Sequence, residues 1–392
     1  MRLCSRHPEC LRGYKSMTIY FVAGETSADN HGAALMSSLR RRDVDLNFIG
    51  RGGPQMRAIA GERFKDWLGD AAVLGLWEVI RKYGYFREQF RETLKEIQGS
   101  KPDAVVLIDY PGFNLRLAHA LRRQSGEQKI IYYISPQVWA WNRGRIKKMA
   151  RFLDLVLCIF PFEADLYNKS GLRAIFVGHP MLERLHSQRI DVDRDPNLVG
   201  LFPGSRLPEV RKIFSVMLES VRELRKQNRN NHFEVAAASQ ELAVGLTEIL
   251  DRHVRDRKVV QIKVGETAAI MRRAFVGIVA SGSATLEAAY FRLPFVLIYK
   301  VAWPTYLAAR LVVNVKYLGM PNVLAGREVV PEFIQNRAKP EAIAKAVWQL
   351  IENADARERM ISEFDTIIGK LGVGEASEMA AGAIIEEIGR SP

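Results

Sequence analysis

Short runs of consecutive apolar residues alternate with longer amphipathic segments along most of the chain. In the first half these runs have the length of strands, and their continuity indicates strands buried on both faces. The strand candidates are Met17–Ala23, Phe48–Gly50, Ala104–Asp109, Lys129–Ile134, Leu155–Ile159 and Ala174–Val177. Apolar positions recur at helical spacing between them, as in Ala28–Arg41, Trp77–Ile97 and Leu115–Arg123. Buried strands separated by helices predict parallel βαβ units.

The alternation stops after Pro180 and resumes beyond a polar stretch that includes Asp191–Asn197. The second series of strand candidates is Leu198–Phe202, Phe233–Ala237, Val259–Ile262, Val276–Ala280 and Pro294–Tyr299. The helical segments of this half are Pro208–Lys226, Glu241–Arg252, Ala284–Phe291 and the whole end of the chain from Pro340 to Gly389. We therefore predict an α/β protein with two Rossmann-like, doubly wound parallel-sheet domains facing a cleft. Ligands of such sheets bind beyond the carboxyl ends of the strands.

The predicted domain limits follow from this break. The length of 392 residues suits two domains. We expect an N-terminal domain at 17–190 and a C-terminal domain at 191–345, with helices in 346–392 that pack back toward the N-terminal domain. Residues 1–16 are basic and lack the apolar core of a secretory signal. We expect them to be a disordered tail or an over-extended start of the chain.

The composition narrows the classes of partner. The formal net charge is +13, but basic residues are interleaved with acidic ones and no zinc finger or RNP-type aromatic motif is present. An anionic lipid surface or an anionic substrate explains this charge better than nucleic acid does. The three cysteines lack metal-ligand spacing, and their odd number argues against a disulfide framework. A reducing cytoplasm is therefore expected. No cofactor is predicted.

Two loops in the first half carry candidate acid–base chemistry. The first apolar run ends in Gly24-Glu25, where glycine allows a tight turn and Ser27 can cap the next helix. The run 104–109 ends in Asp109, and a carboxylate at the carboxyl end of a strand suits a general base. For Asp109 an alternative remains, because an aspartate at this position can simply cap the helix that begins near Asn114.

Two loops in the second half carry groups that suit an anionic ligand. Gly204 allows a close backbone approach, Ser205 can donate to a phosphate, and the fork of Arg206 can neutralise a diphosphate. Asn322 and Arg327 lie in a later loop and are weaker candidates for contact with a phosphate or a sugar. An exposed arginine in an ordinary loop is the competing interpretation of Arg206.

A second strand-to-helix loop in this half resembles a phosphate site. Ser281, Gly282 and Ser283 are small residues that expose backbone N–H groups, and the dipole of the following helix attracts an anion. Glu287, one turn further, can accept hydrogen bonds from both hydroxyls of a ribose. The loop is neither a Walker A motif nor a GxGxxG fingerprint. A buried helix start is the competing interpretation.

Two aromatic and aliphatic stretches are candidates for contact with a membrane. The first is made of apolar residues followed by basic ones, and its predicted contact residues are Val73, Leu74, Leu76, Trp77, Val79 and Ile80. The second runs from Trp303 to Leu307 and continues in 311–313. Tryptophan and tyrosine among aliphatic residues and near arginine or lysine fit an interfacial surface. A face that packs in the core is the more common structure for such a pattern.

Seven segments in order resemble the lipid-A-disaccharide synthase family of bacterial glycosyltransferases. They are Val22–Asp29 (VAGETSAD), Leu74–Val79 (LGLWEV), Ile108–Asn114 (IDYPGFN), Tyr133–Trp141 (YISPQVWAW), Leu201–Val210 (LFPGSRLPEV), Ala280–Glu287 (ASGSATLE) and Pro321–Glu328 (PNVLAGRE). They span the chain from about Met17 to Gln335. The resemblance implies a GT-B fold and no metal. It implies transfer of 2,3-diacylglucosamine from its UDP conjugate to 2,3-diacylglucosamine 1-phosphate, giving the β-1,6-linked disaccharide 1-phosphate of lipid A and UDP.

The resemblance also implies a location and roles for individual residues. It implies an enzyme of Gram-negative lipopolysaccharide synthesis that is peripheral on the cytoplasmic face of the inner membrane and can form a homodimer. Asp109 matches the acidic residue considered for base catalysis. The positions that match substrate-binding or UDP-binding residues are Glu25, Ser27, Arg206, Ser281, Glu287 and Asn322. The chain departs from the family pattern at Ala28, usually glycine, and at Gly112, often acidic.

The reaction implied by the resemblance inverts the donor carbon, which requires one displacement assisted by a base. We expect Asp109, or else Glu25, to be that base. Arg206, the Ser281–Ser283 backbone and the following helix dipole are expected to hold UDP as it leaves. Three alternatives remain: a UDP-sugar 2-epimerase of similar fold, a nucleic-acid-binding protein and a membrane-binding module without turnover.

Overall fold

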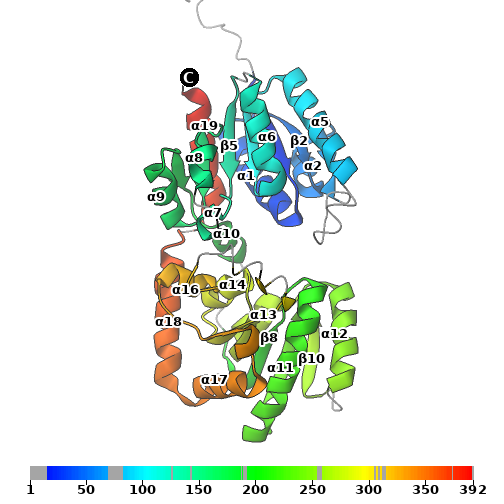
Figure 1. Cartoon of the computed structure of the whole chain (residues 1–392), viewed down its shortest axis with the longest axis vertical. Helices are drawn as coiled ribbons and strands as arrows, with labels where there is room; N and C mark the ends of the chain where they lie inside the picture. Colours follow the sequence, from blue (N-terminus) through cyan, green and yellow to red (C-terminus); the bar gives the residue numbers. More distant parts are fainter. Residues whose placement is uncertain are drawn as a thin grey trace, which may run out of the picture. The chain divides into compact units, whose positions relative to one another are not determined.

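The computed structural model describes most of the chain and divides it into two compact units (Figure 1). The described residues are 16–68, 83–124, 127–141, 144–186, 188, 192–253, 258–303, 306–307, 310, 315–372 and 374–390. The predicted membrane-contact residues from Val73 to Ile80 lie outside these ranges.

The boundary between the two units falls earlier than predicted. The first unit comprises Met1–Val138, Arg143–Pro180 and Glu375–Pro392, and the second comprises Trp139–Asn142 and Met181–Gly374. The expected boundary at 190/191 is therefore corrected to the residue after Pro180. The polar stretch that suggested the later boundary follows helix α10 (Pro180–His186), which already belongs almost wholly to the second unit.

The first unit is built on a seven-stranded parallel sheet in the order β3-β2-β1-β4-β5-β6-β7. Its strands are β1 (Thr18–Ala23), β2 (Asn47–Gly52), β3 (Phe64–Asp66), β4 (Ala104–Ile108), β5 (Lys129–Tyr133), β6 (Leu155–Cys158) and β7 (Ala174–Phe176). Six of them match the apolar runs of the sequence. The edge strand β3 was not predicted, because its three residues include only one apolar side chain.

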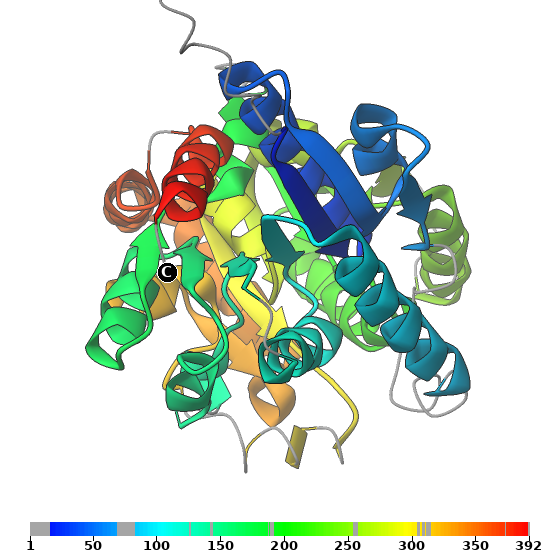
Figure 2. The same ribbon diagram turned by 90° about the horizontal axis from the view of Figure 1, so that it is seen from above.

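Helices cover both faces of this sheet (Figure 2). They are α1 (Thr26–Arg42), α2 (Pro54–Ala60), α5 (Tyr83–Ser100), α6 (Pro111–Arg123), α8 (Arg145–Met149), α9 (Pro161–Lys169) and α19 (Ala376–Gly389), with the short α7 (Val138–Trp141) at the unit boundary. One apolar core packs the sheet against α1, α2 and α19. The other packs it against α5, α6, α8 and α9. This double covering explains why the strands are apolar along their whole length.

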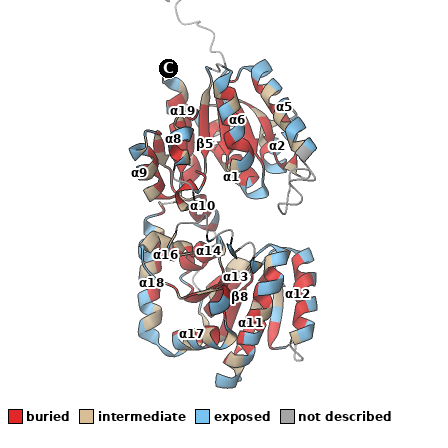
Figure 3. Cartoon of the chain, in the orientation of Figure 1, coloured by how far each residue is buried: buried red, intermediate tan, exposed pale blue. Residues whose placement is uncertain are grey.

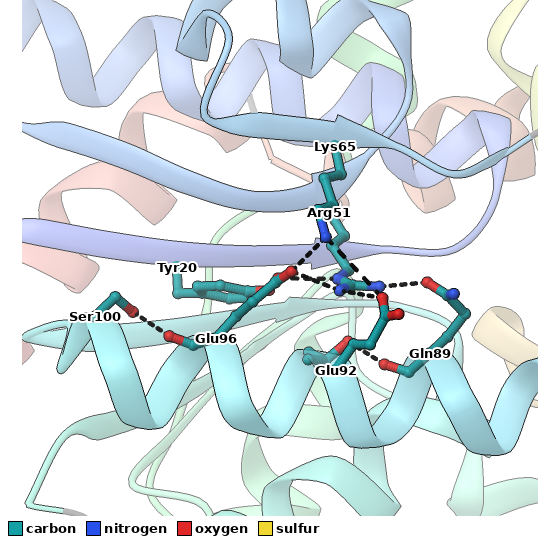
Figure 4. Close-up of polar contacts among 8 residues, drawn as sticks. Tyr20, Arg51, Lys65, Gln89, Glu92, Glu96 and Ser100 are labelled. Atoms are coloured by element: carbon teal, nitrogen blue, oxygen red, sulfur yellow. Dashed lines mark hydrogen bonds and ion pairs between the residues drawn. The ribbon is translucent and has the colours of Figure 1, made fainter.

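Hydrogen bonds around a buried arginine connect α5 to strands β1 and β2 (Figure 4). Arg51 is 0% exposed, and its Nη2 lies 2.7 Å from Glu96 Oε1 and 3.1 Å from Glu92 Oε2. Tyr20 Oη donates to Glu96 Oε2 at 2.6 Å. Burial opposes ionisation of Glu96, but hydrogen bonds from Arg51, Lys65 and Tyr20 outweigh it and lower the pKa of Glu96 to about 2. The arginine is thus buried as a paired charge, which such a group requires.

The second unit contains a six-stranded parallel sheet in the order β10-β9-β8-β11-β12-β13. Its strands are β8 (Asp195–Phe202), β9 (His232–Ala237), β10 (Val260–Val264), β11 (Ala274–Ala280), β12 (Phe295–Tyr299) and β13 (Glu332–Ile334). The short β13 was not predicted, since it has no apolar run of its own. It lengthens the sheet beyond β12 at one edge.

The helices of the second unit pack around its sheet. They are α11 (Leu207–Gln227), α12 (Gln240–His253), α13 (Thr267–Arg273), α14 (Ala284–Tyr290), α16 (Met320–Ala325), α17 (Pro340–Glu352) and α18 (Ala354–Gly369), with a 3-10 turn at Gln335–Arg337. Of the helices expected to pack on the N-terminal domain, only α19 belongs to the first unit. Helix α18 stays in the second, where Phe364 stacks on Phe295 at 5.6 Å.

Burial follows the layers of each unit, with buried strands and exposed outer helix faces (Figure 3). Among the residues described, no helix combines the length and the apolar character needed to cross a membrane.

Candidate active site

Three loops meet at the carboxyl edge of the first sheet. The register pairs Ala23 of β1 with Ile108 of β4, and Ile108 with Tyr133 of β5. Because all three strands are parallel, the residues that follow them lie at the same edge. The sheet therefore brings Glu25 and Asp109, which are distant in sequence, to neighbouring positions.

The turn after β4 has an unusual backbone. Asp109 and Tyr110 both have positive φ, of 46° and 51°. Helix α6 begins at Pro111 with Tyr110 at its N-cap and without a side-chain cap. The alternative that Asp109 only caps this helix is therefore not supported. Open space surrounds Gly112 in the first turn of α6, where a Cβ atom would meet nothing within 4 Å.

The carboxyl of Asp109 can exchange a proton near neutral pH. Burial, and to a smaller extent the neighbouring charge of Glu25, together raise its pKa from 3.8 to about 6. A hydrogen bond from the backbone of Tyr110 acts in the opposite direction. A partly buried carboxyl with such a pKa is suited to accept a proton at physiological pH.

Position 24 needs glycine because the ring of Tyr110 leaves no room for a Cβ atom there, and not because of its backbone conformation. The turn is short, since β1 ends at Ala23 and α1 begins at Thr26, but the φ of Gly24 is not positive. A Cβ at Gly24 would lie 2.4 Å from Tyr110 Cδ1. Burial, then the charge of Glu25, raises the pKa of Tyr110 to about 12. Trp67 packs edge-on against this ring at 6.3 Å, and its Nε1 donates to the carbonyl of Ala23.

The predicted cap at Ser27 is wrong. Helix α1 begins at Thr26 with Glu25 at its N-cap and has no side-chain cap, so Ser27 is an exposed residue of the first turn. Ala28, where the family pattern has glycine, lies inside α1 and is not among the residues with positive φ. Its Cβ therefore causes no strain. A side-chain cap is instead provided by Asp29, but for a different helix: its buried carboxylate accepts from three backbone N–H groups at the start of α2.

The second sheet brings two of the predicted anion-binding loops together. Phe202 of β8 pairs with Val279 of β11, and Ala280 pairs with Ile298 of β12. The loops that follow β8 and β11 therefore lie side by side. Gly204 has φ 102°, and a Cβ there would be 3.8 Å from the Cβ of Ala280.

Arg206 is placed at the start of a long helix. It occupies the N-cap of α11, its side chain is 70% exposed, and Nη1 lies 3.7 Å from Glu209 Oε1. Burial and the charge of Glu209 raise the pKa of Tyr299, while Arg206 lowers it, so the end of β12 also lies near this arginine. An exposed guanidinium with a loose ion pair is available to an anionic ligand.

The loop after β11 is more restricted than predicted. The N–H of Ser281 donates to the carbonyl of Ile298, so it continues the sheet and is not free for a phosphate. Gly282 has φ 150°, and Ser283 is the N-cap of α14. The N–H groups of Thr285 and Leu286 donate to the carbonyls of Gly282 and Ser283. The candidate donors are therefore the N–H groups of residues 282–284, at the start of the helix.

Glu287 has a partner that the sequence did not reveal. Its Oε1 accepts from Arg184 Nη2 at 2.7 Å, and its side chain is 15% exposed. Arg184 lies on α10 and has no motif of its own. Only the fold brings these residues, which are 103 positions apart, into contact.

Asn322 is part of a buried polar network. Its Nδ2 donates to Val330 O and Glu332 Oε1, and its Oδ1 accepts from Val329 N and Val330 N. The carboxylate of Glu332 also accepts from the N–H of Gly319. All four hydrogen-bonding positions of this amide are thus used to hold the loop before β13. Asn322 therefore holds the geometry of this loop, and its predicted contact with a ligand stays a prediction.

Arg327 is paired within the second unit. Its Nη2 lies 2.5 Å from Glu363 Oε1 on α18. It also borders a cavity of about 380 Å³ between its loop, α17 and α18. Its contact with a substrate stays a prediction. In the described part of the chain, no three His, Cys, Asp or Glu side chains are grouped as a metal site requires.

Solved structures show the fold class to which these two sheets belong. A putative UDP-N-acetylglucosamine 2-epimerase from Listeria monocytogenes matches with a TM-score of 0.64 at 11% identity, over 96% of this chain and 98% of that one. The glycotransferase of kitacinnamycin matches with a TM-score of 0.59 at 14% identity, over 95% of this chain and 100% of that one. A transferase from Siraitia grosvenorii in complex with UDP matches with a TM-score of 0.58 at 12% identity, over 96% of this chain and 100% of that one. The chain thus has the twin-Rossmann GT-B architecture.

The family is defined by sequence. The model of the family described as Lipid-A-disaccharide synthetase matches residues 19–383. The lipid-A-disaccharide synthase of Geobacter sulfurreducens is 37% identical over 383 residues, 96% of this chain and 98% of that protein. The lipid-A-disaccharide synthase of Myxococcus xanthus is 34% identical over 94% of this chain and 97% of that protein. The chain belongs to the lipid-A-disaccharide synthase family and is a glycosyltransferase that uses a UDP-sugar donor. The epimerases share only its fold.

Proposed function

We propose that the enzyme joins UDP-2,3-diacylglucosamine to 2,3-diacylglucosamine 1-phosphate, and that Asp109 is the general base. The observation that carries the assignment is the partly buried carboxyl at the end of β4, whose pKa lies near 6. Asp109 takes the proton from the 6-hydroxyl of the acceptor, and that oxygen attacks the anomeric carbon of the donor. A β-1,6 bond forms as the bond to UDP breaks, so the configuration inverts.

The second unit is proposed to hold the leaving UDP. Arg206 faces the diphosphate, the N–H groups of residues 282–284 donate to it, and the dipole of α14 stabilises its charge. Glu287 binds the ribose with the oxygen that Arg184 leaves free. The Siraitia grosvenorii transferase of the same fold was solved with UDP, which supports a UDP site in this architecture.

The test is turnover of the two acylated sugars in detergent, with UDP and the lipid product measured together. A disaccharide 1-phosphate formed with UDP supports the proposal. Asp109→Asn is expected to lower turnover by roughly 10²- to 10⁴-fold while UDP affinity stays unchanged. Near-normal turnover by Asp109→Asn would transfer the role of base to Glu25. Release of UDP without a disaccharide would indicate the epimerase alternative.

Arg206→Ala tests the donor site separately. The variant is expected to weaken UDP binding by about 10-fold or more, because a charge-assisted bond to phosphate is lost. Arg252→Ala, which removes an exposed arginine from α12 of the same unit, is the matched control. Calorimetric UDP affinity that is equal in both variants and the unaltered enzyme would remove Arg206 from the site.

We further propose that the enzyme lies peripherally on the cytoplasmic face of the inner membrane. Trp303 and Leu307 are 57% and 60% exposed, with Arg310 nearby in sequence, a combination that fits an anionic interface. Trp303→Ser combined with Leu307→Ser is expected to reduce cosedimentation with phosphatidylglycerol vesicles. Val244→Ser, at a 55% exposed valine of α12, is the control. Equal binding by both variants would contradict this surface.

The acceptor, the membrane and a second copy of the chain are the partners that this proposal includes. The homodimer rests on the family resemblance alone. Sedimentation velocity in detergent tests it, because a single species of 44.4 kDa at micromolar concentration would exclude a stable dimer.

A further inference from the structure

The carbonyl of Asp109 is held by two side chains from other parts of the first unit. Asn114 Nδ2 donates to it at 2.8 Å, and Tyr132 Oη donates to it at 2.5 Å. The same Nδ2 also donates to the carbonyl of Ile108 at 3.2 Å. The N–H of Asp109 donates to the carbonyl of Tyr133 at 3.0 Å. Both peptide groups of this one residue are therefore fixed.

The backbone at this point requires such support. Asp109 and Tyr110 are consecutive residues in the left-handed region, which is unfavourable for a residue with a Cβ atom. Conformations of this kind persist where the surroundings over-determine them, and they cluster at active sites. The bonds from Asn114 and Tyr132 supply that constraint at the predicted base.

Asn114 holds this position at a cost of its own. The side chain is 0% exposed, and both of its partners are carbonyl oxygens, which can only accept, so the amide nitrogen must face them. Its Oδ1 has no hydrogen-bond partner in the described part of the structure. A buried acceptor without a partner destabilises the folded state. An aliphatic residue would avoid that cost but would not fix the turn.

Tyr132 supplies a donor that does not titrate in the working range. It is fully buried in β5, and burial, then the charge of Asp109, raises its pKa well above the usual value. Two other groups act at this turn itself, Glu25 after β1 and Tyr110 beside Asp109. Tyr85 of α5 acts on Tyr110, and Tyr167 of α9 and Arg145 of α8 act on Tyr132. The hydroxyl therefore keeps its proton while Asp109 changes charge.

We propose that Asn114 and Tyr132 are positioning residues, which keep the carboxyl of Asp109 partly buried beside Glu25 by fixing its backbone. The inference rests on the proposed role of Asp109 as the base. Neither side chain needs to contact a substrate. If the turn relaxes, the carboxyl becomes more hydrated and its proton is held less tightly.

The test compares Asn114→Ala and Tyr132→Phe with the unaltered enzyme over a range of pH. The turnover number of the unaltered enzyme is expected to fall as pH drops through about 6. Each variant is expected to lose roughly 10- to 100-fold in kcat, since small misplacements of a base are costly. The KM for the UDP-sugar should stay within about twofold, because no contact with the donor is removed. The acidic limb of the pH profile should move to lower pH.

Two control variants lose comparable hydrogen bonds elsewhere in the first unit. Asn168 Nδ2 donates to the carbonyl of Ala174 at 2.8 Å, and Tyr20 Oη donates to Glu96. Asn168→Ala and Tyr20→Phe should therefore lose stability without a change in the acidic limb. If Asn114→Ala does not fold, Tyr132→Phe decides the matter, because it removes one hydroxyl and keeps the ring. An acidic limb and a kcat per folded enzyme that match the controls would overturn the proposal.

Failure of the proposed base is distinguishable in the same series. If Asp109→Asn keeps its turnover and its acidic limb, the base is another group, whatever the positioning variants do. If Asp109→Asn is inactive and the positioning variants behave like the controls, only the present inference fails.

Discussion

At the scale of single residues, the most informative group is the carboxyl of Asp109. Its position after a buried strand was visible in the sequence. Its raised pKa was not, because burial and the charge of Glu25 both depend on the packing of separate loops. Ser27 and Asp29 show the opposite case. The sequence favoured the hydroxyl as the cap, but the fold uses the carboxylate of Asp29 to cap a different helix.

Asp109→Asn is expected to stabilise the folded protein at pH values above 6. The pKa of this carboxyl is raised from 3.8 to about 6, so the folded state binds the proton more tightly than the unfolded state. Ionisation therefore destabilises the wild-type fold as pH rises from about 4 to about 6, by up to roughly 3 kcal/mol. Calorimetric melting of both proteins between pH 4 and pH 8 measures this difference. A difference in stability that does not change with pH would contradict it.

At the scale of elements, the turns that follow parallel strands are fitted to one another. The β1–α1 turn passes under the ring of Tyr110 from the β4–α6 turn, and only a residue without a Cβ leaves room for that ring. Likewise α10 supplies Arg184 to Glu287 of α14. Each of these contacts joins segments whose separate patterns say nothing about the partner.

Gly24→Ala tests the fit between the two turns. The added Cβ would lie 2.4 Å from Tyr110 Cδ1, and Trp67 and Phe113 pack against that ring. We expect a loss of about 1–3 kcal/mol in stability, as in other overpacked sites, together with reduced turnover. Gly99→Ala in α5 is the control, because its Cβ would meet nothing within 4 Å. Equal melting temperatures for the two variants would show that the ring can move freely.

At the scale of the whole molecule, the chain returns to its first unit at the end. Ala380, Ala381 and Ile384 of α19 are buried in the core that also contains α1. Glu378 accepts a hydrogen bond from Arg41, which lowers the pKa of this exposed carboxyl. The first unit is therefore complete only when the last segment of the chain is present.

Deletion of the chain beyond Gly374 is expected to destabilise the first unit selectively. The loss of α19 uncovers apolar side chains on one face of the first sheet and breaks the ion pairs of Glu387 with Lys129 and Arg173. UDP affinity should remain, since the proposed donor site lies wholly in the second unit. Truncation after Gly389 is the control. Calorimetry that shows one unchanged and one lowered melting temperature would confirm selective destabilisation of the first unit. Two unchanged melting temperatures would contradict it.

The sequence by itself determined the fold class, the strand and helix order and the family. Apolar runs and helical periodicity are local, and a parallel sheet covered on both faces requires them. It also placed Glu25, Asp109, Arg206 and Glu287 at strand ends or just beyond, which is where parallel sheets bind ligands. Short edge strands such as β3 and β13 escaped this reasoning, since they have too few residues to form a pattern.

Only the tertiary structure decided which of these groups meet and how they are held. The unit boundary after Pro180, the return of α19, the pair of Arg184 and Glu287, and the loop role of Asn322 all depend on contacts between distant segments. The hold of Asn114 and Tyr132 on the carbonyl of Asp109 is of the same kind. Periodicity records which face of an element is buried, but hydrogen bonds, burial and electrostatic shifts arise only when separate elements pack together.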